Sequence, residues 1–184
     1  MIADKIIKPG KNCWQTAPAQ RAKLLIDGEN YFPAIHQAIQ NAQHSVLILA
    51  WDIDSRMQLT RGEEGGQPQE FGHLLCKVLQ QKPALNVYIL NWDWAMLYTF
   101  EREWLPTYRP LWNKQQRLHY ELDGECPTTA SQHQKIVVID NQIAFCGGFD
   151  LGKHRWDGHE HLPDDPRRID PDKQAYPPFH DVQW

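Results

Sequence analysis

The sequence predicts an α/β fold with a central mixed β-sheet flanked by helices on both faces. Three observations support this prediction: apolar segments of strand length, amphipathic segments of helical spacing between them, and a length of 184 residues, which suits one domain with a single core. The eight tryptophans indicate a globular chain, and a net charge of −4 gives none of the overall basic excess that a broad nucleic-acid surface needs.

The expected elements alternate between strand and helix, which favours a sheet covered by helices. The central strand, 45–51, is continuously apolar and is expected to be buried on both faces. In chain order the elements are an arm at 1–22, a strand at 23–26, a turn at 27–28, a helix at 31–42, the strand at 45–51, a loop at 60–69, a helix at 71–79, a strand at 85–93, a broken helix at 94–114, a strand at 117–122, a hairpin within 131–150, a charged and proline-rich surface excursion from 152, and a strand beginning within 179–184.

The hairpin carries the clearest chemical signal. His133 and Lys135 are two residues apart, so on a strand they project to the same side. An imidazole beside a fixed ammonium suits an anionic substrate, because the lysine supplies charge to phosphate oxygens and favours a neutral, nucleophilic ring. We therefore expect this pair to act on a phosphoryl group.

Three further residues of the hairpin have alternative interpretations. Asp140 lies at an odd offset from His133 and in the Asp-Asn turn, so it is either a turn residue or a catalytic one. Gly147 and Gly148 could leave room for a phosphate and offer it their amides, or could form a simple strand-end bulge.

Tryptophan and aspartate residues at the ends of the apolar strands, around positions 51–54 and 92–93, lie where α/β sheets place ligands, although packing and capping explain them equally well.

Taken together, these residues spell H-x-K-x-x-x-x-D followed after six residues by G-G. This pattern resembles the HKD motif of the phospholipase D superfamily. The chain also carries G-G-x-D-L, then an Arg-aromatic-Asp and later a His-Asp, which is similar to the true phospholipase D branch, and the likeness covers residues 20–184.

The resemblance implies a phosphodiesterase that works through a phosphohistidine, without cofactor or metal. It implies His133 as nucleophile or as general acid and base, Lys135 as the group that binds the non-bridging oxygens, and a functional Asp140. It also implies substrate-binding roles for the following residues: Gly147, Gly148, Asp150, Arg155 and Trp156. The implied partner is a phospholipid, with peripheral membrane contact and no nucleic acid.

Members of this family combine two such motifs, and the sequence has one. We therefore expect residues 23–184 to be one half of a catalytic unit, completed either by a longer polypeptide or by a second copy of the chain. Two alternatives stay open: a single-motif nuclease, which the acidic charge disfavours, and a catalytically silent domain that binds membranes or partners.

The remaining features favour ordinary roles. The cluster His159, Glu160, His161, Asp164 and Asp165 is expected to be solvated rather than to bind metal. The four cysteines are scattered, which is typical of a reducing compartment, and the amino-terminal residues carry no apolar segment of signal-peptide length. We expect a cytoplasmic protein, or one exported without such a signal, that acts at the membrane periphery.

Overall fold

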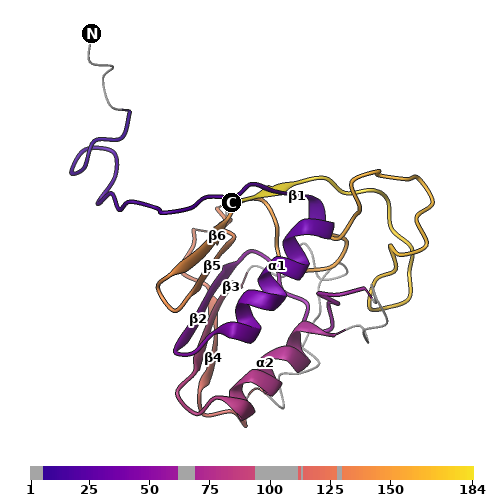
Figure 1. Cartoon of the computed structure of the whole chain (residues 1–184), viewed down its shortest axis with the longest axis horizontal. Helices are drawn as coiled ribbons and strands as arrows, with labels where there is room; N and C mark the ends of the chain where they lie inside the picture. Colours follow the sequence, from indigo (N-terminus) through magenta and orange to yellow (C-terminus); the bar gives the residue numbers. More distant parts are fainter. Residues whose placement is uncertain (1–5, 62–68, 94–111, 113, 128–129) are drawn as a thin grey trace.

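The computed structural model describes residues 6–61, 69–93, 112, 114–127 and 130–184. Its main feature is a five-stranded sheet of order β4-β3-β2-β5-β6, in which β2, β3 and β4 are parallel and β5 and β6 are antiparallel to their neighbours (Figure 1). The strands are β2 (Ser45–Ala50), β3 (Asn86–Trp92), β4 (Leu118–Asp123), β5 (Ile136–Ile139) and β6 (Ile143–Cys146). The predicted mixed sheet is confirmed.

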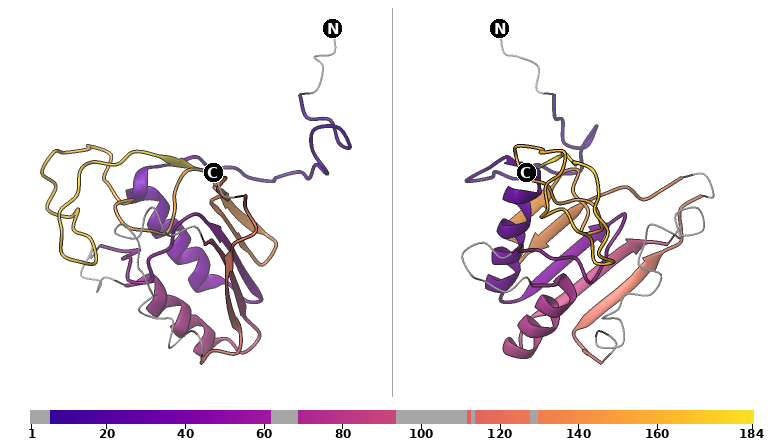
Figure 2. Two further views of the ribbon diagram at one scale, coloured as in Figure 1. Left: turned by 180° about the vertical axis from the view of Figure 1, so that it is seen from behind. Right: turned by 90° about the vertical axis from the view of Figure 1, so that its right-hand side faces the viewer.

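Two helices, α1 (Asp27–Asn41) and α2 (Phe71–Gln81), lie together on one face of this sheet (Figure 2). Each buries an apolar stripe at helical spacing, with Tyr31, Ile35 and Ile39 completely or almost completely buried in α1. The expectation of helices on both faces is therefore supported for one face only. The helix expected over 94–114 falls almost entirely outside the described residues. Neither described helix is long and apolar enough to cross a membrane.

The sheet buries its side chains unequally. In β2, Val46, Ile48 and Ala50 are buried against the helices, whereas Leu47 and Leu49 are only partly buried. The prediction that this strand is buried on both faces is thus wrong, because successive side chains alternate between a covered and a less covered face.

A second, two-stranded sheet connects the two ends of the domain. β1 (Leu25–Ile26) pairs antiparallel with β7 (Val182–Gln183), and the expected strands at 23–26 and 179–184 are confirmed in these shorter forms. The turn predicted at 27–28 is instead the start of α1, where Asp27 has a φ of 62°. Residues 6–22, the predicted arm, extend away from the sheet (Figures 1 and 2).

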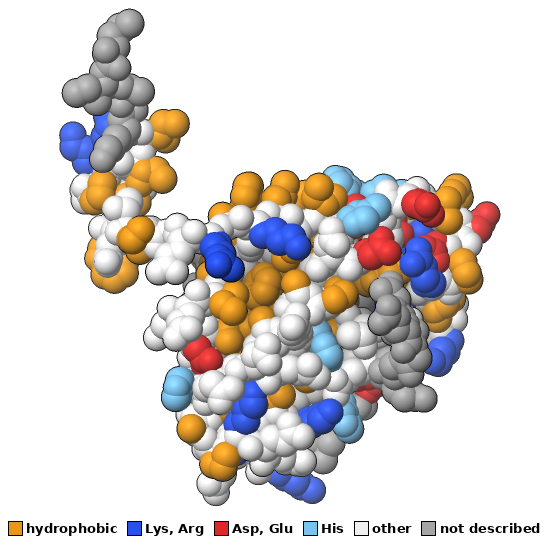
Figure 3. Space-filling model, in the orientation of Figure 1, with side chains coloured by type: hydrophobic (Ala, Val, Ile, Leu, Met, Phe, Trp, Pro, Cys, Tyr) orange, Lys and Arg blue, Asp and Glu red, His pale blue; other side chains and the backbone are white. Residues whose placement is uncertain are grey.

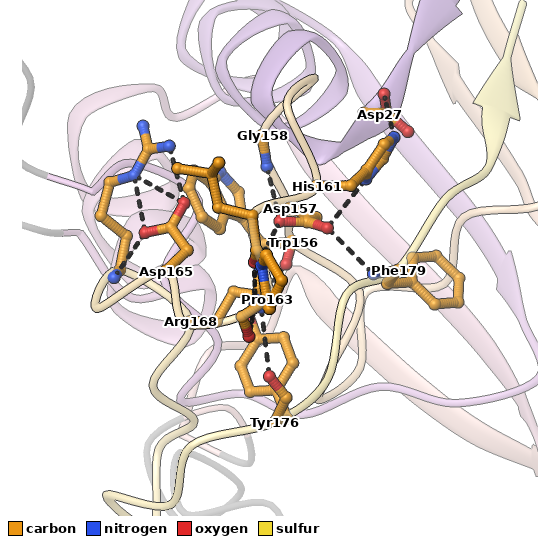
Figure 4. A network of polar contacts seen from close by, with 12 residues as sticks. Asp27, Trp156, Asp157, Gly158, His161, Pro163, Asp165, Arg168, Tyr176 and Phe179 are labelled. Atoms are coloured by element: carbon orange, nitrogen blue, oxygen red, sulfur yellow. Dashed lines mark hydrogen bonds and ion pairs between the residues drawn. The ribbon is translucent and has the colours of Figure 1, made fainter.

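The excursion after residue 152 is fixed by a buried ion pair (Figure 4). The Arg168 Nη1 lies 2.7 Å from Oδ1 of Asp157, and the two side chains are 1% and 0% exposed. Arg168 also donates to the carbonyl oxygens of Pro163 and Tyr176, so one guanidinium holds three parts of the segment together. The charged segment predicted to lie on the surface therefore has a polar core of its own.

The close approach of β7 to the residue after β6 gives a test of this architecture. A Cβ on Gly147 would lie 2.4 Å from the backbone oxygen of Val182, so Gly147→Ala has to displace β7. We expect urea denaturation to show a loss of about 1–3 kcal/mol in the free energy of unfolding. Gly124→Ala is the control, since its Cβ would meet only a side-chain oxygen of Asp93 at 3.3 Å. Equal effects of the two substitutions would contradict the packing described.

Candidate active site

The pairing of β5 with β2 determines where the predicted catalytic residues lie. The strands are antiparallel and Leu49 is opposite Ile136, so the residues before Ile136 run beside those that follow Leu49. His133 and Lys135 consequently lie at the carboxyl end of β2, in the segment that leads into β5 rather than in the strand itself.

Lys135 is buried, with 9% of its surface exposed. Its Nζ lies 3.2 Å from Oδ2 of Asp150, whose side chain is 1% exposed. A buried ammonium is tolerated only where an opposite charge compensates it, which Asp150 does here. The ion pair therefore fixes the position of the lysine head group.

Asp150 in turn holds the backbone that follows β2. Its Oδ1 accepts the amide N–H groups of Trp51 and Asp52 at 3.0 and 3.2 Å. Burial, and secondarily the negative charge of Asp150, raise the pKa of Tyr31 well above its usual value. Asp150 is 2% exposed and both its oxygens are engaged, so in this structure it contacts Lys135 and the backbone after β2, and a direct substrate contact by Asp150 stays a prediction.

His133 and Lys135 approach one indole, although both precede β5 and the strand alternation assumed from their spacing therefore does not apply to them. The exposed His133 ring meets the Trp51 ring edge-to-face at 5.7 Å between centroids, and the Lys135 Nζ is 5.8 Å from the Trp51 centroid. Trp51 itself stacks on the buried Trp92 at the end of β3. The arrangement places an accessible imidazole and a fixed cation against the same indole. Since an ammonium has three donors, its contacts to Asp150 and to the carbonyl oxygen of His133 leave capacity for a substrate oxygen.

Gly147 and Gly148 lie where β7 approaches the end of β6. The Gly147 amide donates to the carbonyl oxygen of Lys135 at 3.4 Å, and the Gly148 amide donates to that of Val182 at 3.1 Å. A Cβ on Gly148 would meet the Asp181 carboxylate at 2.0 Å. Glycine is needed here because β7 approaches closely, which favours the strand-end alternative, and a phosphate contact by these residues stays a prediction.

Asp140 lies at the opposite end of β5 from His133, in the hairpin turn. Its carboxylate accepts three backbone N–H groups, from Gln43, His44 and Ser45, at 2.7–2.8 Å. Burial alone would raise the pKa of Asp140, but these hydrogen bonds outweigh it and hold the pKa below its usual value. This geometry favours the turn alternative, in which Asp140 anchors the start of β2 to the hairpin, and a functional role of Asp140 stays a prediction.

Arg155 and Trp156 line a small pocket between the loop after β2 and the excursion. Trp156 is 3% exposed and lies between two guanidinium groups, those of Arg61 at 4.6 Å and Arg167 at 5.0 Å. Neither His133 nor Lys135 lines this pocket. A substrate contact by Arg155 and Trp156 stays a prediction, and it concerns a surface separate from the histidine.

Two polar residues near the site escaped the sequence-based prediction. Both amide atoms of Gln132, which precedes His133, are buried without a hydrogen-bond partner in the part of the chain described. Asn91 lies one residue before Trp92 in β3. Its Oδ1 is also buried without a hydrogen-bond partner among the described residues, while its Nδ2 donates to the Tyr120 hydroxyl. Buried unpaired amides are costly, so they are candidates for substrate contact. In the sequence, these two residues are marked only by their neighbours: Gln132 precedes His133 of the motif, and Asn91 precedes the end of its strand.

Comparison with known proteins identifies the family of the chain. No model of a protein family matches the chain. Phospholipase D A of Dictyostelium discoideum is 31% identical over 140 residues, 73% of this chain, and phospholipase D zeta 2 of Arabidopsis thaliana is 29% identical over 168 residues, 89% of this chain. The chain belongs to the phospholipase D superfamily. It spans only 10% and 16% of the length of these two relatives.

Solved structures confirm the phospholipase D-like fold. NucT from Helicobacter pylori superposes with a TM-score of 0.54 at 13% identity, over 88% of this chain and 81% of that one. Nuc from Salmonella typhimurium, a phospholipase D family member, gives 0.50 at 11% identity, over 88% and 79% of the two chains. The superfamily member described here thus shares its fold with these two proteins.

The anchoring role of Asp140 can be tested by its pH dependence. Because its folded pKa lies below the unfolded value of about 3.9, its stabilisation is present above that pH and is lost as pH falls through the folded pKa. Asp140→Asn should therefore lower the free energy of unfolding by about 1–3 kcal/mol near neutral pH, with a smaller difference from wild type in acid. Urea denaturation at both pH values measures this, and an unchanged neutral stability would contradict the role.

Proposed function

We propose that this chain is a phosphodiesterase domain in which His133 attacks phosphorus and Lys135 stabilises the charge on the non-bridging oxygens. One observation carries the proposal: an exposed imidazole and a buried, ion-paired lysine both approach the same tryptophan ring. The histidine can reach a substrate, while the lysine is held in place before the substrate arrives. Such preorganisation is what stabilises a charged transition state.

The reaction proceeds in two displacements. A ring nitrogen of neutral His133 forms a bond to phosphorus, and the bond from phosphorus to the leaving alcohol breaks as that oxygen takes a proton. Water then attacks the phosphohistidine, gives up a proton to the group that protonated the leaving alcohol, and releases the phosphate monoester with His133 restored. An alcohol in place of water would yield a new phosphodiester, which is transphosphatidylation.

The proton for the leaving alcohol requires a second acid, since His133 is bonded to phosphorus at that moment. A second histidine from another HKD motif is the group with the right chemistry. It comes either from a longer polypeptide, in which residues 23–184 form one half, or from a second copy of the chain. The two sources differ in that only the second makes the rate per chain rise with chain concentration.

A phospholipid is the substrate that the observations favour. The sequence relatives named above, which match 73% and 89% of this chain, are phospholipases D, and the Arg155-Trp156-Asp157 and His180-Asp181 patterns resemble those of the phospholipase D branch. A nucleic-acid phosphodiester is the second candidate, because the fold matches those of NucT and Nuc. The net charge of −4 disfavours it, as a nucleic-acid track is usually basic.

Replacing the nucleophile gives the direct test. His133→Ala should reduce release of phosphatidic acid from phosphatidylcholine vesicles by at least about 10³-fold, because no other group then forms the covalent intermediate. His119→Ala is the matched control: His119 is also exposed and also contacts an aromatic ring, that of Tyr88, but lies on β4.

Parallel assays with single-stranded DNA distinguish the two substrate classes, and a range of chain concentrations distinguishes the two sources of the second histidine. Mass spectrometry of rapidly quenched reactions should find the acid-labile phosphoryl adduct on His133. Turnover that survives His133→Ala would contradict the mechanism.

A further inference from the structure

The arm that precedes β1 carries the two most exposed large apolar side chains in the described part of the chain. Trp14 is 91% exposed and Ile6 is 88% exposed, and Ile7 beside it is 57% exposed. A single exposed apolar side chain is ordinary on a protein surface, but three within residues 6–14 mark a surface with a partner. Because the arm extends away from the sheet, the domain itself does not cover them (Figures 1 and 2).

Hydrogen bonds within residues 6–14 close this part of the arm into a loop. The amides of Lys11 and Asn12 donate to the carbonyl oxygen of Lys8 at 3.0 and 3.2 Å. The Asn12 side chain accepts the Lys8 amide at 2.7 Å and donates to the carbonyl oxygen of Ile6 at 2.8 Å. A loop that pairs its own backbone groups in this way can leave water without stranding them, which a segment entering the boundary of a lipid bilayer requires.

The arm is also a basic segment on an acidic protein. Residues 6–23 contain four cations and no aspartate or glutamate: Lys8, Lys11, Arg21 and Lys23. Since the whole chain has a net charge of −4, the remainder carries −8. Figure 3 shows basic and hydrophobic side chains together on the arm where it projects from the domain. The charge of the arm is thus complementary to an anionic surface, whereas that of the remainder is not.

The arm joins the domain at the end of the sheet where the HKD residues lie. It leads into β1, which pairs with β7. Immediately after β7, Trp184 exchanges two backbone hydrogen bonds of 3.0 Å with Cys146, the last residue of β6. Cys146 is opposite Ile136, the residue that follows Lys135. A surface bound by the arm is therefore on the side of the domain that carries His133.

We propose that residues 6–23 are an interfacial anchor that binds the surface of an anionic phospholipid membrane. Tryptophan prefers the headgroup region of a bilayer, and lysines close to it attract anionic lipids. A nucleic acid fits the arm less well, because exposed isoleucines offer no planar face on which bases stack. The anchor directs the His133 end of the domain toward lipid phosphates; this orientation rests on the proposed function, and the anchoring does not.

The test uses the full chain in the His133→Ala background, so that binding is measured without turnover and independently of the phosphohistidine reaction. Co-sedimentation should show binding to mixed phosphatidylcholine and phosphatidylglycerol vesicles, and much less to phosphatidylcholine alone. Trp14→Ala should weaken binding by about tenfold or more, because a large apolar side chain is lost. Lys11→Gln/Lys23→Gln should weaken it by about 30-fold, since each lysine near an anionic surface contributes about fivefold. All three side chains are exposed, so the fold is not at risk.

Matched controls replace side chains of the same kinds elsewhere. Tyr88→Ala removes an exposed aromatic ring from β3, and Lys77→Gln/Lys114→Gln removes two exposed lysines. Neither should change vesicle binding by more than about twofold, and added salt should weaken the binding of the parent chain.

Brominated acyl chains give a direct readout of insertion, since they should quench tryptophan fluorescence in the parent chain and much less in Trp14→Ala. Three results would overturn the proposal. The first is equal binding to neutral and anionic vesicles. The second is an equal loss in the arm variants and their controls. The third is an absence of vesicle binding, including the case in which the arm instead supports retention of single-stranded DNA or self-association in sedimentation.

Discussion

The buried ion pair between Lys135 and Asp150 is the interaction on which the arrangement of the site depends. Lys135 precedes β5, Asp150 follows β6, and the second oxygen of Asp150 holds the amides of Trp51 and Asp52 after β2. A buried charge is tolerated only while its partner is in place, so the hairpin and the end of β2 cannot shift independently. His133, two residues from Lys135, is thereby kept at a fixed place while its own ring stays exposed. The same contacts that stabilise the domain orient the reactive group.

Hydrophobic periodicity was sufficient to predict the elements whose burial is decided locally. The apolar stripes of α1 and α2 and the apolar character of β2 and β3 are properties of short windows, and the structure confirms all four. The pairing of β1 with β7 has no such local signal, because the two strands come from opposite ends of the domain. The start of α1 at Asp27 was missed for a related reason: Asp-Gly favours a turn locally, but here the amides of Asp27 and Glu29 donate to the carbonyl oxygens of Asp181 and Asp157.

In the candidate site, spacing drew attention to His133 and Lys135 but not to the residues that hold them. Both approach the Trp51 ring from the segment before β5. The roles of Asp140, Gly148 and Asp150 depend instead on partners that are distant in sequence: the start of β2, the segment entering β7, and Lys135. The excursion shows the same limit, since its charge and proline content suggest a solvated surface while Arg168 and Asp157 are buried in it. Composition does not reveal which charges meet.

A double-mutant cycle on the ion pair tests this account most directly. Asp150→Ala should lower the free energy of unfolding by about 3–5 kcal/mol, because it leaves the ammonium of Lys135 buried without a counter-charge. Adding Lys135→Met should restore most of that stability, since it removes the stranded charge in a similar volume, yet the double variant should form no phosphohistidine. Losses that simply add, with reactivity preserved in the double variant, would contradict the claim that this ion pair both stabilises the domain and positions its chemistry.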